Sequence, residues 1–441
     1  MGPRFRCSGC GTEQPAVADA ATALPFRCVA ARPGDDIDHI VVSEARPTAT
    51  DAVDPSAEPP LLRWRRRLSA HALAVDGGLG DSGFRALYDE LADALGRIEG
   101  QPPTATRLIT IRPTTFRMKS TIHGKVEADF VAGSHKARHL LPVLLWLRVA
   151  ESIGLLDRAA RRPLAIASCG NAALAAATLA AAAAWPIRVF VPPNAADAVV
   201  ARLQALGATI VRCPRRPGEA GDPCVLRARE ATGAGAIPFC VQGSECGMTI
   251  EGAEILAFET AEQLADLGCH PTAAAPLDVA VQIGGGALAS GFSAGLRAAG
   301  VPHRLFPVQM EGCAPLARAY EASLAVPTEA LDETGRALAA PRSRAMWPWQ
   351  PTPASAATGI LDDETYDWRA VVAATRHSGG RPLVTPESAL EPARALAEAA
   401  TDTALAFTGV AGLAGVLATP QAFGPNVLVL LSGQRRGADP G

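Results

Sequence analysis

The stretch AGSHKARHL at residues 132–140 is the part of the chain that decides how the rest is interpreted. It places Lys136 after a small Gly-Ser pair and just before an apolar run, residues 140–156, that predicts a buried helix. A lysine at the start of a packed helix loses hydration, and the positive end of the helix dipole disfavours its charged form. Both effects make the amine a better nucleophile towards a carbonyl, whereas a lone lysine in most sequences is a solvated surface residue.

Length and composition indicate a large α/β protein. The 441 residues predict two or three domains, and 48% hydrophobic residues with 41 glycines and few aromatics are typical of a globular enzyme. The net charge of −3 argues against a nucleic-acid partner. The N-terminus has no apolar signal region and no charge-free apolar run has membrane-spanning length, so we expect no membrane contact and a cytoplasmic location. Ten scattered cysteines fit reduced thiols better than a disulfide framework.

The first residues outline a zinc ribbon. Cys7 and Cys10 form a Cys-x-x-Cys-Gly pair, and Cys28 follows after a short loop. Tetrahedral structural zinc needs four ligands, usually as two close pairs, and position 31, where a partner for Cys28 is expected, is Ala31. The three cysteines therefore outline an incomplete ligand set, and the sequence favours no bound metal here without excluding one. Residues 43–60, rich in Pro, Ala, Asp and Glu, are interpreted as a loop or linker.

From residue 163 onward, short apolar strands alternate with helical segments. Strands are expected at 164–167, 187–191, 209–212, 277–283, 305–310 and 427–431, and helices at 172–184, 196–206, 225–232, 247–267, 288–299, 314–325, 367–375, 386–400 and 404–417. An earlier amphipathic helix is expected at 84–98, and residues 326–360 are interpreted as an irregular excursion. This alternation predicts a doubly wound parallel sheet covered by helices on both faces.

Three strand-to-helix junctions carry unusual residues. In doubly wound sheets, ligands bind beyond the carboxyl ends of the strands. The segment Ser168-Cys169-Gly170-Asn171 suits a carboxylate, although Ser or Asn there is also an ordinary helix cap. Gly284-Gly285-Gly286-Ala287-Leu288 lets the backbone approach a phosphate, although one or two glycines would serve a tight turn equally well. At the third junction, Ser432-Gly433 offers a hydroxyl to a ring nitrogen.

Taken together, these groups match what one cofactor requires. A Schiff-base lysine, a nearby amide, a phosphate loop and a strand-end hydroxyl are the contacts that pyridoxal phosphate makes with proteins. The chain resembles the fold-type II pyridoxal-phosphate enzymes of the tryptophan synthase β-like superfamily, which include threonine synthase, threonine and serine dehydratases, and diaminopropionate ammonia-lyase. The resemblance rests on five short motifs in the expected order across residues 110–435: KVE at 125–127 with AGSHKAR at 132–138, SCGN at 168–171, GGGAL at 284–288, TGVAGLAG at 408–415 and LSG at 431–433.

The resemblance implies a role for each motif. Lys136 would form the internal aldimine and move protons at Cα, and Asn171 would contact the ring hydroxyl oxygen of the cofactor. Residues 284–288 would hold its phosphate, and Ser432 would face the pyridine nitrogen. Ser168, Cys169, Gly170 and Asn171 would bind the carboxylate of a small amino-acid substrate. A hydroxyl beside the ring nitrogen accompanies elimination or replacement at Cβ or Cγ in this family.

The resemblance also implies an architecture. Residues 61–435 would form two doubly wound parallel-sheet domains with the active site between them, the smaller domain at about 140–250 being inserted in the larger. Residues 1–60 would be a degenerate zinc-ribbon-like segment with its linker, and residues 436–441 a tail. A homodimer is expected by family analogy.

The function expected from the sequence is that of a pyridoxal-phosphate-dependent lyase of amino-acid metabolism. It would act on a small amino acid by β-elimination, giving ammonia and a 2-oxo acid, or by the related β- or γ-replacement. Alternatives are a threonine synthase-like phospho-lyase and an eroded homologue that only binds ligand. A nicotinamide-dependent oxidoreductase is less consistent, because no acidic residue is suitably placed after the glycine loop. His135, Arg138 and His139 depart from the familiar pattern, and their roles in substrate phosphate binding, proton transfer or packing stay open.

Overall fold

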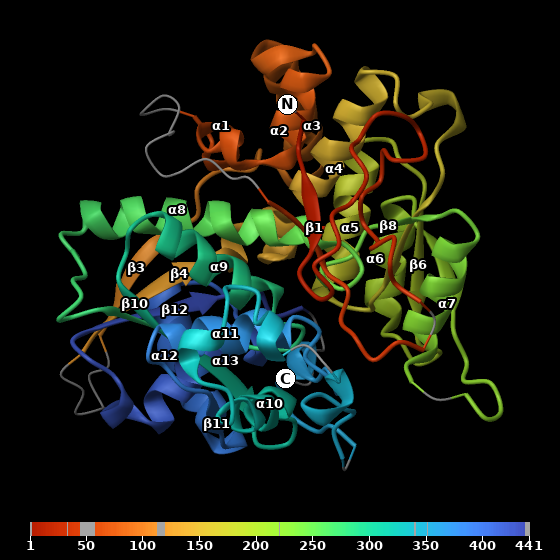
Figure 1. Cartoon of the computed structure of the whole chain (residues 1–441). Helices are drawn as coiled ribbons and strands as arrows, with labels where there is room; N and C mark the ends of the chain where they lie inside the picture. The colour runs from red at the N-terminus through yellow and green to blue at the C-terminus, as the bar shows by residue number, and fades with distance from the viewer. Residues whose placement is uncertain are drawn as a thin grey trace.

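The computed structural model describes residues 2–32, 34–44, 58–112, 120–219, 221–338, 341–350 and 352–436. Two main sheets lie side by side, and an N-terminal segment runs along them (Figure 1). The predicted linker at 43–60 and the tail at 436–441 fall largely outside the described residues. None of the helices in the described ranges is both long enough and apolar enough to cross a membrane.

The larger sheet has six strands in the order β11-β10-β9-β12-β4-β3. Its neighbours pair in parallel except for β3, which is antiparallel to β4. The strands are β3 Leu108–Ile111, β4 Thr121–Val126, β9 Leu277–Gln282, β10 His303–Met310, β11 Leu383–Thr385 and β12 Asn426–Leu431.

The smaller sheet is wholly parallel, in the order β7-β6-β5-β8. Its strands are β5 Leu164–Ala167, β6 Ile187–Val191, β7 Thr209–Arg212 and β8 Ile237–Pro238. A third, two-stranded antiparallel sheet joins β1 Phe5–Cys7 to β2 Val41–Ser43.

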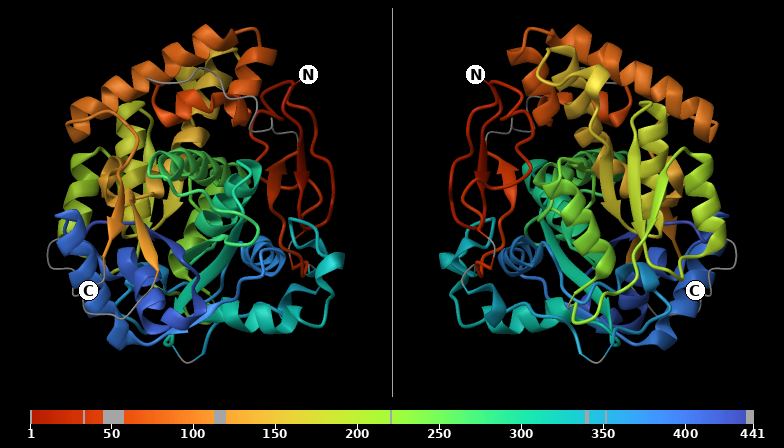
Figure 2. Two further views of the ribbon diagram at one scale, coloured as in Figure 1. Left: turned by 90° about the vertical axis from the view of Figure 1, so that its left-hand side faces the viewer. Right: turned by 90° about the vertical axis from the view of Figure 1, so that its right-hand side faces the viewer.

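Helices cover the main sheets on both faces, as Figures 1 and 2 show. They are α1 Pro60–Arg63, α2 Ser69–Asp76, α3 Gly80–Glu99, α4 Lys136–Ser152, α5 Asn171–Ala182, α6 Asp197–Ala205, α7 Pro223–Gly233, α8 Ile250–Asp266, α9 Ala287–Ala298, α10 Pro315–Ser323, α11 Trp368–His377, α12 Leu390–Thr401 and α13 Phe407–Ala418. The chain is therefore a mixed α/β protein with parallel sheets, as the sequence predicts.

The pleat of β12 explains how this strand serves two cores. Val427, Val429 and Leu431 belong to the cluster that packs on α12 and α13, while Leu428 and Leu430 belong to the cluster that packs on α8, α9 and α11. Successive side chains of a strand point to opposite faces, so an unbroken apolar strand must be covered on both sides. The carboxyl end of β12 is thereby fixed in the middle of the sheet, where Ser432 follows it.

Helix α4 connects the two halves of the protein. Its side chains are almost entirely buried in one core with α3, α5 and the strands of the smaller sheet. The helix begins at Lys136 and ends at Ser152, four residues earlier at each end than the predicted apolar run. We propose the boundaries given above for the inserted smaller domain, since β5 to β8 all lie within residues 164–238.

Six strands and two helices of the described residues are missing from the sequence prediction: β1, β2, β3, β4, β8, β11, α1 and α2. These segments are short or carry charged residues, so they lack the apolar pattern from which a buried strand or helix is predicted. Lys125 in β4 is the clearest case, because it is fully buried despite its charge. Residues 326–360 contain only single-turn 3-10 helices where they are described, in agreement with the predicted irregular excursion.

Candidate active site

The loop before Lys136 is hydrogen-bonded to the loop that follows β12. The backbone N–H and the Nδ1 of His135 lie 3.2 and 3.0 Å from the carbonyl oxygen of Ser432. The N–H of Gln434 donates to the carbonyl of Gly133 at 3.0 Å. Two motifs whose contacting residues are 297 positions apart in the sequence thus become neighbours, because α4 starts at the carboxyl edge of the larger sheet.

Lys136 is the first residue of α4 and is enclosed by protein while keeping some solvent contact. Burial lowers the pKa of the Lys136 amine below its usual range, and nearby Asp362 acts in the opposite direction. Among the described residues, Nζ of Lys136 has no hydrogen-bond or ion-pair partner. The predicted nucleophile is therefore positioned, partly desolvated and free to react.

Ser432 is only 2% exposed, and its hydroxyl accepts a hydrogen bond from Nε2 of Gln282. The second hydrogen of that amide goes to the carbonyl of Leu430 at 3.0 Å. Because Gln282 donates, the hydrogen of the Ser432 hydroxyl remains available to a further acceptor. A neutral ring nitrogen is such an acceptor.

Asn171 lies beside this edge and is held there by a residue that the sequence analysis assigned to the tail. Nε of Arg436 donates to Oδ1 of Asn171 at 2.8 Å, and the same guanidinium donates to the carbonyl of Ala132. With its oxygen occupied, the Asn171 amide directs its N–H groups elsewhere. Gly433 makes room for it, since a methyl group on Gly433 would come within 2.8 Å of the amide nitrogen.

The glycine loop follows β9 and leads into α9. Gly286 has a φ of +97°, a conformation that side-chain-bearing residues rarely adopt. The first turn of α9 has no side-chain cap, and within the described ranges the N–H groups of Gly284, Gly285 and Gly286 donate to no protein acceptor. A set of open N–H groups at a helix N-terminus is an anion site.

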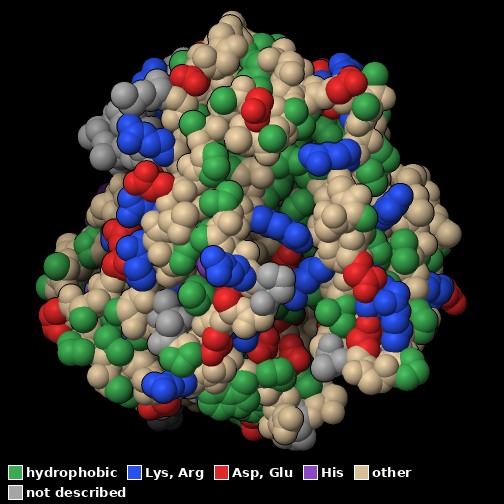
Figure 3. Space-filling model, turned by 45° about the vertical axis from the view of Figure 1, so that its right-hand side comes forward, with side chains coloured by type: hydrophobic (Ala, Val, Ile, Leu, Met, Phe, Trp, Pro, Cys, Tyr) green, Lys and Arg blue, Asp and Glu red, His purple; other side chains and the backbone are tan. Residues whose placement is uncertain are grey.

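Asp362 lies against this loop and was missed by the sequence analysis. A methyl group on Gly284 would come within 2.6 Å of its Oδ2. Burial raises the pKa of Asp362 to about 6, Lys136 opposes this rise, and Asp363 and Asp222 add to it. On the face of the molecule drawn in Figure 3, acidic and basic side chains lie close together around a hollowed area. No local sequence signal marks Asp362, which lies two residues after the predicted irregular excursion.

The fourth predicted segment opens α5. The hydroxyl of Ser168 accepts from the N–H of Gly170 at 3.3 Å, and Cys169 and Gly170 are exposed. Among the described residues, no side chain caps the start of helix α5, so its first N–H groups are open to a carboxylate. The bond from Arg436 to Asn171 ties this segment to the loop that carries Lys136.

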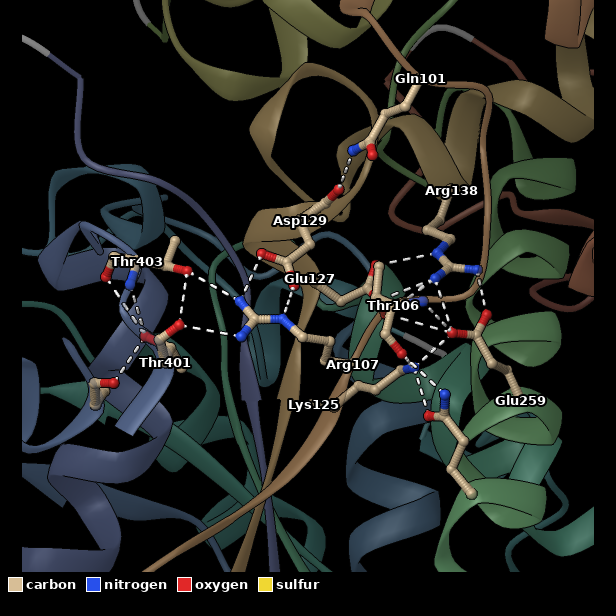
Figure 4. A network of polar contacts seen from close by, with 12 residues as sticks. Gln101, Thr106, Arg107, Lys125, Glu127, Asp129, Arg138, Glu259, Thr401 and Thr403 are labelled. Atoms are coloured by element: carbon tan, nitrogen blue, oxygen red, sulfur yellow. Dashed lines mark hydrogen bonds and ion pairs between the residues drawn. The ribbon is translucent and has the colours of Figure 1, made fainter. Parts of the chain in front are cut away.

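Arg138 belongs to a buried ion network behind the site (Figure 4). Its guanidinium lies 3.0 Å from Oε1 of Glu127 and 2.6 Å from Oε2 of Glu259. Lys125 also contacts Glu259, and Thr106 bonds both carboxylates. The donors of Arg138 are thus used inside the protein, which favours packing over substrate binding.

The two histidines also make internal contacts. Nδ1 of His139 lies 2.8 Å from the carbonyl of Thr249, and burial lowers the pKa of His139 to about 4. Burial, together with Lys136 and His139, holds the pKa of His135 well below its usual range. Both rings are therefore neutral at pH 7, and each Nδ1–H can donate to the carbonyl that it faces.

A family model described as pyridoxal-phosphate dependent enzyme matches residues 101–433, which are most of the chain and include all five motifs quoted from the sequence. The chain belongs to this family. Pyridoxal phosphate is therefore its cofactor, as the sequence predicts. No curated protein sequence gave a match.

Solved structures show the same fold at low sequence identity. A threonine deaminase from T.th. has a TM-score of 0.59 and 22% identity, and the match covers 79% of this chain and 98% of that one. Maize serine racemase has a TM-score of 0.58 and 19% identity, covering 80% and 94%. An L-serine ammonia-lyase from Rhizomucor miehei has a TM-score of 0.56 and 15% identity, covering 76% and 94%. Identities this low show the fold-type II architecture alone.

The described residues fit the cofactor. The amine of Lys136 is free, the N–H groups of residues 284–286 are open, and Ser432 and Asn171 each have a hydrogen to donate. Asp362, which lies against this loop, opposes a phosphate in its ionised form, and its raised pKa eases its protonation.

Proposed function

We propose that this protein is a pyridoxal-phosphate-dependent lyase that removes ammonia from a small amino acid by β-elimination, or carries out the related replacement. The observation that carries the proposal is that the loop before Lys136, whose amine is free, is hydrogen-bonded at one sheet edge to the segment that carries the Ser432 hydroxyl. A hydroxyl, unlike a carboxylate, does not hold a proton on the ring nitrogen, and this favours loss of a β-substituent. A homodimer is part of the proposal by family analogy.

In this proposal, different residues bind the substrate, bind the cofactor and transfer the proton. Pyridoxal phosphate, when bound, would supply the electron withdrawal that acidifies the Cα proton of the substrate. Open N–H groups at residues 168–171 bind the substrate carboxylate, and those at 284–288 bind the cofactor phosphate. Nζ of Lys136, made less basic by burial, takes the Cα proton and returns one to the departing group.

The threonine synthase-like alternative gains no support from the geometry. A phosphorylated substrate needs cations beyond the cofactor phosphate loop. Arg138, the cation nearest to Lys136 in the sequence, is neutralised by Glu127 and Glu259. We therefore prefer a substrate without a phosphate group.

Two measurements test the proposal. Purified protein loaded with pyridoxal phosphate should show a visible absorption band that borohydride removes, and peptide mapping should find the reduced cofactor on Lys136. A panel of amino acids should then release equal amounts of ammonia and 2-oxo acid, with serine and threonine tested first.

Lys136→Ala is the negative control. It should show neither the borohydride-sensitive absorption band nor the release of ammonia and 2-oxo acid. A wild-type protein that gives racemised amino acid without ammonia would refute the lyase assignment. Phosphate release from O-phosphohomoserine would favour the alternative.

A further inference from the structure

Four side chains able to bind a metal converge in the N-terminal segment. Cys7, Cys10, Cys28 and His39 place one ligand atom each within 4.8 Å of all the others. Sγ of Cys7 lies 3.5 Å from Nδ1 of His39, and Sγ of Cys10 lies 3.7 Å from Sγ of Cys28. The edges of a tetrahedron around zinc, with its usual bonds to sulfur and nitrogen, are about 3.4–3.8 Å long.

The missing fourth ligand of the ribbon is thus a histidine far from the position where a cysteine was expected. His39 stands eleven residues after Cys28, just before β2, which pairs with the strand that ends at Cys7. Pairing of β1 with β2 brings His39 back to the cysteines. Sequence spacing alone did not reveal this, because the return depends on strand pairing.

The surroundings of the four ligands match those of metal-bound groups. Nε2 of His39 lies 2.9 Å from Oδ2 of Asp35, and a carboxylate on the second ring nitrogen fixes the tautomer that coordinates through Nδ1. The N–H of Ala30 and the side chain of Gln14 both donate to Sγ of Cys28, which suits a thiolate.

A disulfide does not explain the cluster. All ten cysteines are free, and the 3.7 Å between Cys10 and Cys28 is well beyond the roughly 2.0 Å of a sulfur–sulfur bond. A cluster of three sulfurs and one imidazole matches zinc, because thiolates and neutral imidazole are its preferred ligands.

We propose that Cys7, Cys10, Cys28 and His39 bind one structural zinc ion. Four protein ligands close the coordination sphere, so the ion has no open position for catalysis. Binding releases the protons of the cysteine thiols as they become thiolates. The proposal does not depend on which reaction the active site performs.

The segment between the third and fourth ligands shows what the ion would hold in place. Asp38 accepts from the indole of Trp368 at 2.6 Å and from Nε of Arg342 at 2.8 Å, and its carbonyl accepts from Arg369 at 2.7 Å. Figure 2 shows the N-terminal segment alongside the excursion at residues 326–360. Asp367, the residue before Trp368, donates its N–H to the carbonyl of Gly285 at 2.8 Å. The zinc loop therefore supports the segment that packs on the phosphate loop.

Metal analysis of the full-length holoenzyme tests the proposal. Protein made with zinc in the medium and purified without chelator should contain about one zinc per chain. His39→Ala and Cys28→Ser should lose most of it, while His39→Cys should keep it because a thiolate replaces the imidazole. The matched controls are His270→Ala and Cys269→Ser, which change the same residue types outside the cluster.

Two further measurements do not depend on variant folding. A mercurial reagent should release zinc from the wild-type holoenzyme, as seen with a chromophoric chelator. Cobalt-substituted protein should show thiolate-to-cobalt absorption bands and the strong visible bands of a tetrahedral ion.

Three results would overturn the proposal. These are zinc-free protein that does not take up added zinc under reducing conditions, unchanged zinc content in both His39→Ala and Cys28→Ser, or a thiol titration of the unfolded protein that finds two fewer than the ten free cysteines.

Discussion

At the scale of single residues, the most unusual feature of the site is the carboxyl group of Asp362 beside the glycine loop. Its carboxyl group lies against the loop expected to hold a phosphate, and its pKa of about 6 places its ionisation within the working range of most enzymes. A negative phosphate favours the protonated acid. Cofactor binding should therefore be linked to proton uptake by Asp362.

Replacing this carboxyl group tests the linkage. The affinity of the wild type for pyridoxal phosphate should fall as pH rises from 6 to 8, because Asp362 becomes ionised beside the phosphate. Asp362→Asn should bind on the order of tenfold more tightly at pH 8 and differ little at pH 5.5. Equilibrium titration followed by absorbance measures this.

Asp363→Asn is the matched control. The carboxyl group of Asp363 is half-buried and, unlike that of Asp362, is not among the atoms nearest to the glycine loop. Pyridoxal without phosphate should show a much smaller difference between wild type and Asp362→Asn. Weaker binding by Asp362→Asn at pH 8 would contradict the linkage.

Arg436 is a positioning residue at the same scale. Arg436→Ala should leave the Asn171 amide free to rotate and should weaken cofactor binding several-fold, with little change in the thermal midpoint. Arg435→Ala is the control, because that exposed side chain pairs with Glu398 away from Asn171. Equal effects of the two substitutions on cofactor affinity would argue against the positioning role.

At the scale of elements, the network of Arg138, Glu127, Glu259 and Lys125 joins α4 and α8 to β4. Although burial alone would raise the pKa of Glu259, Arg138 and Lys125 lower it below its usual range. Two buried cations thus balance two buried carboxylates, and removing one partner leaves an uncompensated charge.

Arg138→Met should therefore lower the free energy of unfolding by about 3–5 kcal/mol. Urea denaturation of the cofactor-free protein measures this. Arg216→Ala, which removes a cation from an exposed ion pair with Glu230, should change stability by less than about 1 kcal/mol. A loss below about 1 kcal/mol for Arg138→Met would show that the network is not needed for stability.

The same elements show where sequence-based prediction succeeds. Strands β5, β6 and β7 were predicted to the residue, because apolar runs bounded by turns depend on local sequence alone. Strand β4 was missed because its burial depends on a partner, Glu259, that is 134 residues from Lys125. His39, Asp362 and Arg436 were missed for the same reason, since only tertiary structure brings them to their partners.

At the scale of the whole molecule, Asp367 connects parts that are distant in the sequence. Its carboxyl group accepts from the N–H of Gly243 at 3.2 Å, and its own N–H donates to the carbonyl of Gly285. Burial raises the pKa of Asp367 to about 7. Because the pKa is higher in the folded than in the unfolded state, the folded protein binds more protons between about pH 4 and pH 7.

Ionisation of Asp367 should therefore reduce stability as pH rises through this window. Asp367→Asn should be more stable than the wild type at pH 8, by on the order of 2–4 kcal/mol, and the two should converge at pH 4. Urea denaturation at both pH values measures the difference. A variant that is less stable than the wild type at pH 8 would show that the carboxylate has a compensating partner.

The exposure of Cys169 has a practical consequence for following ligands. Its side chain is exposed, whereas the other nine cysteines are buried or half-buried, and it lies in the segment proposed to bind the substrate carboxylate. The folded protein thus offers an accessible thiol for a maleimide dye, within the region that a ligand would cover. Attached there, a fluorophore would report occupancy in real time, and the rate of its attachment would itself reveal whether an amino acid shields the thiol.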